Sequence, residues 1–303
     1  MSDALAGTSD PTRSGWKAAA PTGGPGLTPG PRRPPRTPGR GRPQSAMWRL
    51  RGEIPGSLSL ALGIAGMVVL FLMWVAAAAL TGADRIVPTP AATWSAAVEL
   101  WDSGDLWPDF LASAERVAIG YAISVSIGFT VGVLTGSFRS FDAFTEGQIG
   151  FLRYIPATAL LPVFLFWLGI DESPKIALIV VGTVFYNVLM SADVVRNVPR
   201  ELINVSYTLG AGRLKVLRRV IVPHSVPGLI DVARINLAAA WLMLVVSELL
   251  AAQEGLAFRI VRAQRFRQVD RMFALLIILG IIGVISDLAL RKLRDRAAPW
   301  ARP

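Results

Sequence analysis

A few charged residues lie inside the long apolar stretches of this sequence, where an ionised side chain is costly, and Arg116 and Glu248 are two of them. Arg116 follows the start of one apolar stretch, and Glu248 precedes the end of another. Charged side chains inside a membrane are costly and face partner helices or a water-filled path. We expect Arg116 and Glu248 to lie at similar depth. Two interpretations stay open: a structural ion pair that locks two helices, or a gate or anion-coordinating wall.

The stretch that carries Glu248 has a polar and aromatic stripe. Arg234, Trp241 and Glu248 recur every seven residues, which places them on one helix face over about 21 Å. Such a stripe is expected to face other helices or a water-filled path rather than lipid. With Arg116, and with Ser124 from the next pattern, this gives the candidate translocation path: Arg116, Ser124, Trp241 and Glu248.

Small residues recur every four positions in the stretch that carries Arg116. They are Gly120, Ser124, Gly128, Gly132 and Gly136. Small residues at this spacing let a second helix approach closely. Close packing is therefore the favoured interpretation of the stripe, against a role for Ser124 in lining a path.

Several kinds of chemistry are excluded by composition. The sequence has no cysteine and one histidine, His224, so disulfides, thiolate nucleophiles and Cys- or His-rich metal sites are absent. No phosphate-binding loop of the form GxxxxGK[ST] occurs, and the segment GAGRLK (210–215) has the wrong spacing. We expect no catalytic residue, cofactor or metal in this chain.

Hydrophobic residues make up 52% of the 303 residues and charged residues 17%, a balance typical of a membrane protein. Apolar runs long enough to cross a bilayer predict six helices. Pro156 and Pro162 are expected to kink the third of them. The predicted helices lie near 58–80, 112–136, 151–169, 174–193, 226–252 and 272–291.

The distribution of basic residues predicts the orientation. Of the 31 lysines and arginines, 21 fall in the N-terminal segment, near Arg139, between Arg196 and Arg219, and after Arg291. The positive-inside rule makes this face cytoplasmic, with both termini on it. The segment 253–271 is the exception, and we interpret its five arginines as a basic external surface.

Residues 1–56 differ from the rest of the chain. They contain ten glycines, ten prolines and nine basic residues, a composition that does not bury enough apolar surface to fold. We expect a disordered cytoplasmic tail here and a membrane domain over 57–303. The apolar run that follows is too long for a secretory signal.

The longest polar loop, 195–229, reads as two short amphipathic helices. Leu202, Val205 and Leu209 recur at helical spacing, and Gly210 is expected to break that helix. A second helix is expected to continue until Pro223 ends it. The loop therefore predicts a compact knob on the cytoplasmic side.

From Gly210, nine residues lead to Val220-Ile221-Val222-Pro223. This spacing resembles the cytoplasmic signature of binding-protein-dependent ABC importer permeases, EAA, three residues, Gly, nine residues, Ile-x-Leu-Pro. The EAA triplet falls on Asn204, Val205 and Ser206, and the nearest acidic residue, Glu201, lies one turn earlier. The signature implies docking of ATPase subunits by Ser206, Tyr207, Leu209, Gly210, Ala211, Leu214 and Pro223.

The resemblance extends over residues 60–300 and is to the nitrate, sulfonate, taurine and bicarbonate branch. The matching stretches are 87–100, 115–136, 155–176, 238–260 and 279–293. It implies an all-α protein with about six transmembrane helices and a cytoplasmic coupling-helix loop, the type I ABC importer permease architecture.

The resemblance also implies partners and cargo. They are a second permease copy, two ATP-binding cassette subunits that hold ATP and Mg, and an extracytoplasmic solute-binding protein, in a prokaryotic plasma (inner) membrane. The implied cargo is a small anion or organic acid such as nitrate, sulfonate, taurine or bicarbonate.

A self-sufficient secondary transporter or channel is the alternative function. Such a transporter should show an internal repeat and paired ionisable residues at mid-membrane, and no convincing repeat is found. A membrane enzyme is a weaker alternative, because no nucleophile–base or paired-carboxylate arrangement occurs.

Overall fold

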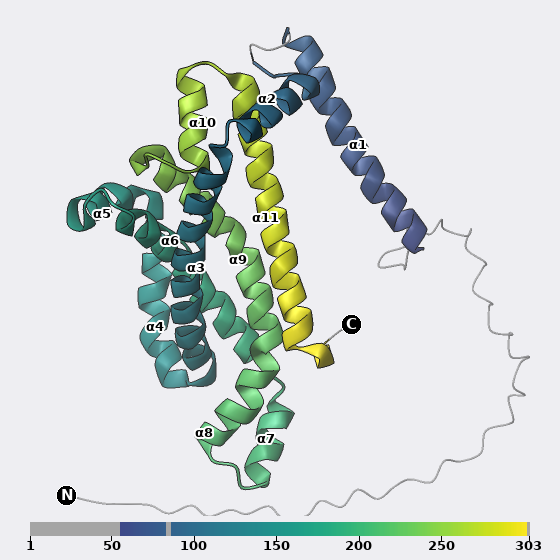
Figure 1. Ribbon diagram of the computed structural model, residues 1–303. Helices are drawn as coiled ribbons and strands as arrows, with labels where there is room; N and C mark the ends of the chain where they lie inside the picture. Colours follow the sequence, from purple (N-terminus) through teal and green to yellow (C-terminus); the bar gives the residue numbers. More distant parts are fainter. Residues whose placement is uncertain (1–54, 83–85, 302–303) are drawn as a thin grey trace, which may run out of the picture. The chain divides into compact units, whose positions relative to one another are not determined.

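The computed structural model describes residues 55–82 and 86–301 (Figure 1). Its contacts divide the chain after Gly63 into two units. Of the first unit, the structure describes residues 55–63, which begin helix α1 (Gly56–Leu80). The predicted tail, 1–56, lies outside the described residues except for its last two positions.

The long helices are those whose sequence is apolar enough to span a bilayer. Five described segments meet this condition of length and composition, and they confirm five of the six predicted spans. The segments are α1, α3 (Leu106–Ser137), α6 (Ser173–Arg196), the run Arg213–Ala251, and α11 (Val269–Ala297).

The third predicted span, 151–169, is wrong as a single kinked helix. The chain instead forms α4 (Arg139–Leu152), the 3₁₀ turn η2 (Ala157–Leu160) and α5 (Leu161–Leu168), bent by 77° at the break. Proline lacks an amide donor and fits the first turn of a helix. Pro156 accordingly precedes η2, and Pro162 lies in the first turn of α5.

The stripe of small residues brings α3 against α6, as predicted. A Cβ added to Gly132 would lie 2.5 Å from the Ser191 Cβ, and one added to Gly136 would lie 2.6 Å from the Ala192 carbonyl oxygen. Real Cβ atoms do not approach this closely, so only glycine permits the contact. The helices α3, α6 and α9 (Val222–Ala251) share a buried core: Val117, Tyr121, Ile179, Leu237, Ala240 and Leu244.

Four shorter helices lie at the two ends of the bundle. At one end, called the α10 end, are α2 (Pro90–Asp102) and α10 (Leu256–Arg265) (Figure 1). At the other, called the α7–α8 end, are α7 (Arg200–Thr208) and α8 (Arg213–Val216). Helix α9 connects the two ends.

Pro223 does not end a helix, contrary to the prediction. A π-helical turn, η3 (Leu217–Ile221), joins α8 to α9, and Pro223 lies in the first turn of α9. The Val222 amide bonds to the Leu217 carbonyl, five residues back. This wider turn shifts the hydrogen-bond register just where proline offers no donor, so the helix continues through it.

Candidate functional site

The α7–α8 end carries the loop singled out by the sequence. Gly210 adopts φ +77° and ends α7, as predicted. Its amide bonds to the Tyr207 carbonyl at 2.9 Å, and the Ala211 amide bonds to the Ser206 carbonyl at 3.0 Å. This pair of bonds is a Schellman motif, which requires a left-handed residue where glycine carries no steric penalty. The motif fixes the angle between α7 and α8.

The predicted docking residues divide into exposed and inward-facing groups. Tyr207, Leu209 and Leu214 are 46%, 81% and 58% exposed, and Gly210 and Pro223 are exposed as well. Ala211 is half-buried against the core beneath the loop, which consists of Val195, Val198, Val216 and Ile221. Ser206 is also half-buried, and its hydroxyl donates to the Leu202 carbonyl.

Two further residues extend the exposed apolar surface. Leu202 and Val205 are 43% and 57% exposed, and with Leu209 they lie at helical spacing on one face of α7. Apolar side chains grouped on a protruding loop mark an interaction surface. We call Leu202, Val205, Tyr207, Leu209 and Leu214 the α7–α8 surface.

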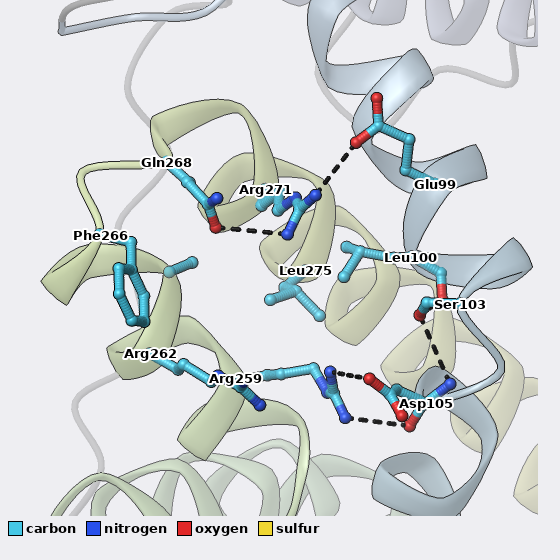
Figure 2. A pocket seen from close by; sticks show the side chains of 11 residues that line it. Glu99, Leu100, Ser103, Asp105, Arg259, Arg262, Phe266, Gln268, Arg271 and Leu275 are labelled. Carbon is cyan, nitrogen blue, oxygen red and sulfur yellow. Dashed lines mark hydrogen bonds and ion pairs between the residues drawn. The ribbon is translucent and has the colours of Figure 1, made fainter.

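At the α10 end, the basic segment 253–271 forms the α9–α10 link, α10, the α10–α11 link and the first residues of α11. Arg259 pairs with Asp105 at 3.0 Å and with Asp109. Burial alone would lower the pKa of Arg259, but its bonds to Asp109 and Asp105 raise that pKa above its ordinary value. Arg271 pairs with Glu99 at 3.1 Å, and these side chains surround a cavity (Figure 2). In the described part of the chain, no ion-pair partner is found for Arg262, Arg265 or Arg267.

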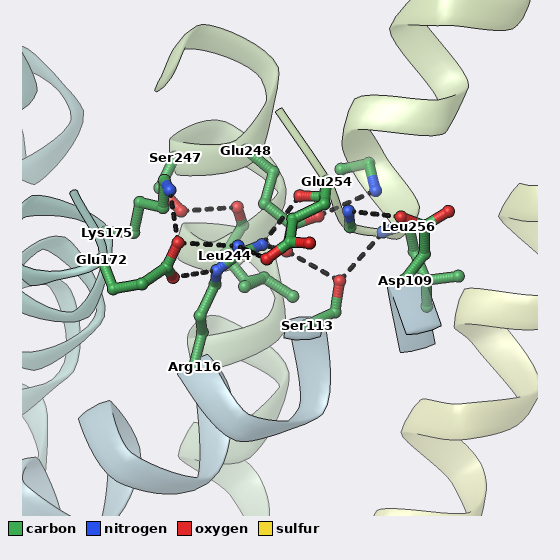
Figure 3. A network of polar contacts seen from close by, with 12 residues as sticks. Asp109, Ser113, Arg116, Glu172, Lys175, Leu244, Ser247, Glu248, Glu254 and Leu256 are labelled. Carbon is green, nitrogen blue, oxygen red and sulfur yellow. Dashed lines mark hydrogen bonds and ion pairs between the residues drawn. The ribbon is translucent and has the colours of Figure 1, made fainter. Parts of the chain in front are cut away.

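Below this segment, Arg116 and Glu248 form the predicted ion pair. The Arg116 Nη1 lies 2.8 Å from the Glu248 Oε1, and the two side chains are 2% and 0% exposed. Arg116 also pairs with Glu172, bonds to the Glu254 carbonyl at 2.9 Å and lies 3.6 Å from the Glu254 carboxylate (Figure 3). One guanidinium therefore connects α3, the residue before α6, α9 and the α9–α10 link.

Glu248 also caps the N-terminus of α10. Its Oε2 accepts the Ala257 amide at 2.9 Å, and its Oε1 accepts the Ser113 hydroxyl at 2.7 Å. Ser113 in turn accepts the Leu256 amide at 2.9 Å, and Asp109 accepts the Gly255 amide at 2.8 Å. The first amides of a helix have no partner within it, so side chains from α3 and α9 supply the missing acceptors.

Glu172 is the part of this network that solvent reaches. Its side chain is 50% exposed, and Lys175 bonds to it at 2.7 Å. Hydrogen bonds from Arg116 and then Lys175, together with the charge of both, lower the pKa of Glu172 to about 2. A cavity of about 700 Å³ opens beside Glu172, Lys175 and Glu254.

Sequence reasoning missed Glu172, Glu254, Asp109 and Ser113. Glu172 is 56 residues from Arg116, and Ser113 is 135 residues from Glu248. The one available signal was Ser113, one turn before Arg116 on the same helix face.

Ser124 lies in a buried polar cluster between helices. It accepts the Thr183 hydroxyl at 2.7 Å and the Asn187 amide at 3.0 Å, and Asn187 accepts the Asn236 amide at 2.8 Å. Ser124, Thr183 and Asn187 are each 0% exposed. The cluster joins α3, α6 and α9 in the interior of the bundle.

The predicted stripe of Arg234, Trp241 and Glu248 on α9 faces two different helices, α11 and α3. Arg234 and Trp241 line a groove of about 490 Å³ together with residues of α11, and Arg234 pairs there with Asp287 at 3.0 Å. Glu248 faces α3 instead. The Trp241 indole nitrogen is buried and has no hydrogen-bond partner in the described part of the chain.

Metal ligands are not grouped anywhere in the described residues, where no cluster of three or more His, Cys, Asp or Glu side chains suits a metal ion. His224 is exposed in the first turn of α9. The geometry instead provides an exposed apolar surface at one end and a buried ionic network at the other.

Comparison with known proteins gives one family and consistent relatives. The family "Binding-protein-dependent transport system inner membrane component" matches residues 125–298. A Brucella melitensis protein described as a "Probable ABC transporter permease protein" is 36% identical over 252 residues, which are 83% of this chain and 99% of that protein. The taurine transport system permease protein TauC of Escherichia coli is 31% identical over 83% of this chain and 94% of its own length.

A solved structure supports the same architecture. The inward-facing MetNI methionine ABC transporter matches 62% of this chain and 93% of its own chain, with a TM-score of 0.56 and 21% sequence identity. At this identity, the likeness concerns the fold.

Proposed function

Because this chain belongs to the family of binding-protein-dependent transport system inner membrane components, we propose that its α7–α8 surface is where the ATPase subunits of the importer dock. The chain is the permease subunit of an ABC importer, and ATP is bound and hydrolysed by separate subunits. This membership sets aside the self-sufficient secondary transporter and the channel.

The observation that carries the docking proposal is the exposed apolar face at the α7–α8 end. Leu209 is 81% exposed and Leu214 is 58% exposed, while the core beneath them holds the loop in one shape. Burial of such side chains against a partner is favourable by about 25 cal/mol per Å². Of the other predicted docking residues, Tyr207 belongs to this face, and Ser206, Gly210 and Ala211 form the turn that supports it. Pro223 lies in the first turn of α9.

The docking test is co-purification. Leu209→Asp, made with Leu214→Asp, should abolish recovery of the ATPase subunits with the tagged permease. Thr208→Asp is the matched control, because Thr208 is exposed on the same loop and outside the α7–α8 surface. Wild-type recovery of the ATPase in the double variant would refute the docking proposal.

We propose that the cargo is a small anion, with sulfonates such as taurine as the first candidates and nitrate, bicarbonate or another organic acid as further ones. The support is the likeness to TauC over 83% of this chain, together with the branch resemblance of its matching stretches. Uptake of radiolabelled taurine, nitrate and bicarbonate into cells that express the whole transporter would test this. Uptake of none of them would reject taurine, nitrate and bicarbonate as cargo and leave the subunit assignment intact.

We propose that the permease works as a homodimer in a prokaryotic plasma (inner) membrane, with both termini in the cytoplasm and a solute-binding protein at the α10 end. One chain contributes five or six candidate spans, about half of the helices that the resemblance implies for a complete translocation pore.

The proposed topology can be tested by cysteine labelling, because the chain has no cysteine of its own. Ser140→Cys at the α7–α8 end should resist a membrane-impermeant maleimide in intact cells, and Ser103→Cys at the α10 end should react. Labelling of Ser140→Cys but not of Ser103→Cys would contradict the proposed topology.

We also propose that Arg116 and Glu248 form a gate at the α10 end of the path, with Trp241 and Ser124 further along it. The support is that the Arg116 network connects four segments of the chain at one level, so that separating them requires breaking ion pairs. Uptake measured beside thermal stability, for variants of either residue and of both together, separates a gate from a purely structural pair.

A further inference from the structure

The cavity at the α10 end has the chemistry of an anion site. Its volume is about 280 Å³, and three arginines and two carboxylates line it: Arg259, Arg262, Arg271, Glu99 and Asp105. Arg259 and Arg271 are neutralised by those carboxylates. Arg262 is exposed and has no ion-pair partner in the described part of the chain, so the lining keeps one positive charge.

The position of the cavity along α11 gives its depth in a membrane. Arg271 lies one helical turn before Leu275, and both residues line the cavity. From residue 272 to residue 286, α11 carries no charged residue, and Leu276 and Ile277 are 52% and 41% exposed. The hydrocarbon region therefore begins at about the level of Leu275. Arg271, one turn beyond it, falls within the headgroup layer, which is about 5–7 Å deep on each side.

Helix α2 gives a second, independent indication of where the membrane–water interface lies. Trp94 and Trp101 are 73% and 67% exposed, and their seven-residue spacing places them on one helix face. Exposed tryptophans of membrane proteins gather at the membrane–water interface. Glu99 and Leu100 of this helix line the cavity, so the cavity lies beside the end of α2 that carries Trp101.

We propose that this cavity binds the phosphate of an anionic phospholipid headgroup in the leaflet at the α10 end. A phosphodiester carries a single negative charge, which matches the one positive charge left on the lining. Arg262 and Arg271 offer planar donors that suit its oxygens. A zwitterionic lipid would bring a choline cation against the same arginines, so anionic lipid is favoured. Arg262 and Arg271, which lie at an end where the positive-inside rule expects few basic residues, thereby have a ligand.

The test measures lipid binding to the full-length purified chain by native mass spectrometry, with phosphatidylglycerol, phosphatidylcholine and soluble glycerol phosphate as probes. We expect tighter binding of phosphatidylglycerol than of phosphatidylcholine. Arg262→Gln should weaken phosphatidylglycerol binding about tenfold, the typical effect of losing one charge-assisted hydrogen bond. The double variant with Arg271→Gln should weaken it further. The single variant keeps the test valid if loss of the Arg271–Glu99 pair harms folding.

The matched control is Arg265→Gln with Arg267→Gln, which removes two exposed charges from the same segment without touching the cavity lining. This control should bind phosphatidylglycerol within about twofold of the wild type. An equal loss in the control, or no loss in Arg262→Gln, would overturn the proposal. Competition by glycerol phosphate at the concentration at which the lipid binds would also overturn it, because the site would then need no membrane lipid.

Discussion

Gly255 has no room for a side chain because a Cβ at this position would lie 2.5 Å from the carboxylate of Glu248. Its φ of +120° is also a conformation that other residues rarely adopt. The backbone of the α9–α10 link therefore packs directly on the buried carboxylate that caps α10.

Gly255→Ala should destabilise the protein, because the added methyl group must displace Glu248 and the backbone is strained as well. We expect a loss of about 1–3 kcal/mol, seen as a lower thermal unfolding midpoint in detergent. Gly280→Ala is the control, since nothing lies within 4 Å of its added Cβ and alanine favours helix. A midpoint for Gly255→Ala equal to that of the control would contradict the tight packing.

Removal of one partner of the Arg116–Glu248 pair should cost about 3–5 kcal/mol, because it leaves a buried charge unpaired. The double variant Arg116→Met with Glu248→Gln should recover much of this stability. Recovery will be incomplete, because Arg116 also holds Glu172 and Glu254.

The same variants separate a gate from a structural pair. If the pair is a gate, the double variant regains thermal stability but fails to support uptake by the assembled importer in reconstituted vesicles. Full recovery of uptake would leave the pair with a structural role alone. Both quantities are measured on the two single variants and on the double, so that the coupling between the residues is obtained for stability and for uptake.

Stability should fall with acid through Glu172. Its pKa is lowered from 4.5 to about 2, so its ion pairs contribute fully above the unfolded-state value and are lost as the pH falls from about 4.5 towards 2. Thermal unfolding midpoints of the wild type should therefore drop over this range more steeply than those of Glu172→Gln. Glu146→Gln, which removes an exposed carboxylate elsewhere, should keep the wild-type slope. Parallel curves for the wild type and Glu172→Gln would contradict the assignment.

Gly210→Trp should prevent ATPase docking while the membrane helices stay folded. The substitution strains a residue at φ +77° and places bulk between the two halves of the α7–α8 surface. Gly212→Ala is the control, because Gly212 adopts an ordinary φ of −72°. ATPase recovered with Gly210→Trp at the wild-type yield would place the docking surface elsewhere.

Much of the fold followed from local patterns in the sequence. Apolar length predicted the long helices, the four-residue spacing of glycines predicted the contact of α3, and Gly210 predicted the end of α7. Each of these depends on the chemistry of one segment.

The wrong predictions concern prolines, whose effect on a helix depends on the surrounding structure. A proline can kink, end or start a helix. Pro156 and Pro162 lie at the start of η2 and α5, whereas at Pro223 the helix continues from the preceding π-helical turn. The π-helical turn before Pro223 depends on hydrogen bonds that shift register, and hydropathy carries no sign of such a shift.

Only part of the ionic network was accessible from the sequence. Arg116 and Glu248 were predicted as a pair because each lies in an apolar stretch and the two have similar predicted depths. Glu172 and Glu254 lie in polar links, where a carboxylate is ordinary, and only the tertiary fold brings them to Arg116.

The segment Arg213–Ala251 forms a continuous helical rod of 39 residues, about 58 Å long at 1.5 Å per residue. Leu214 of the α7–α8 surface lies at one end of this rod and Glu248 at the other. A displacement of the first end reaches the second through the helix itself, by way of the π-helical turn η3 and Pro227. Force exerted on the α7–α8 surface would therefore have a route through one helical segment to the carboxylate that holds Arg116.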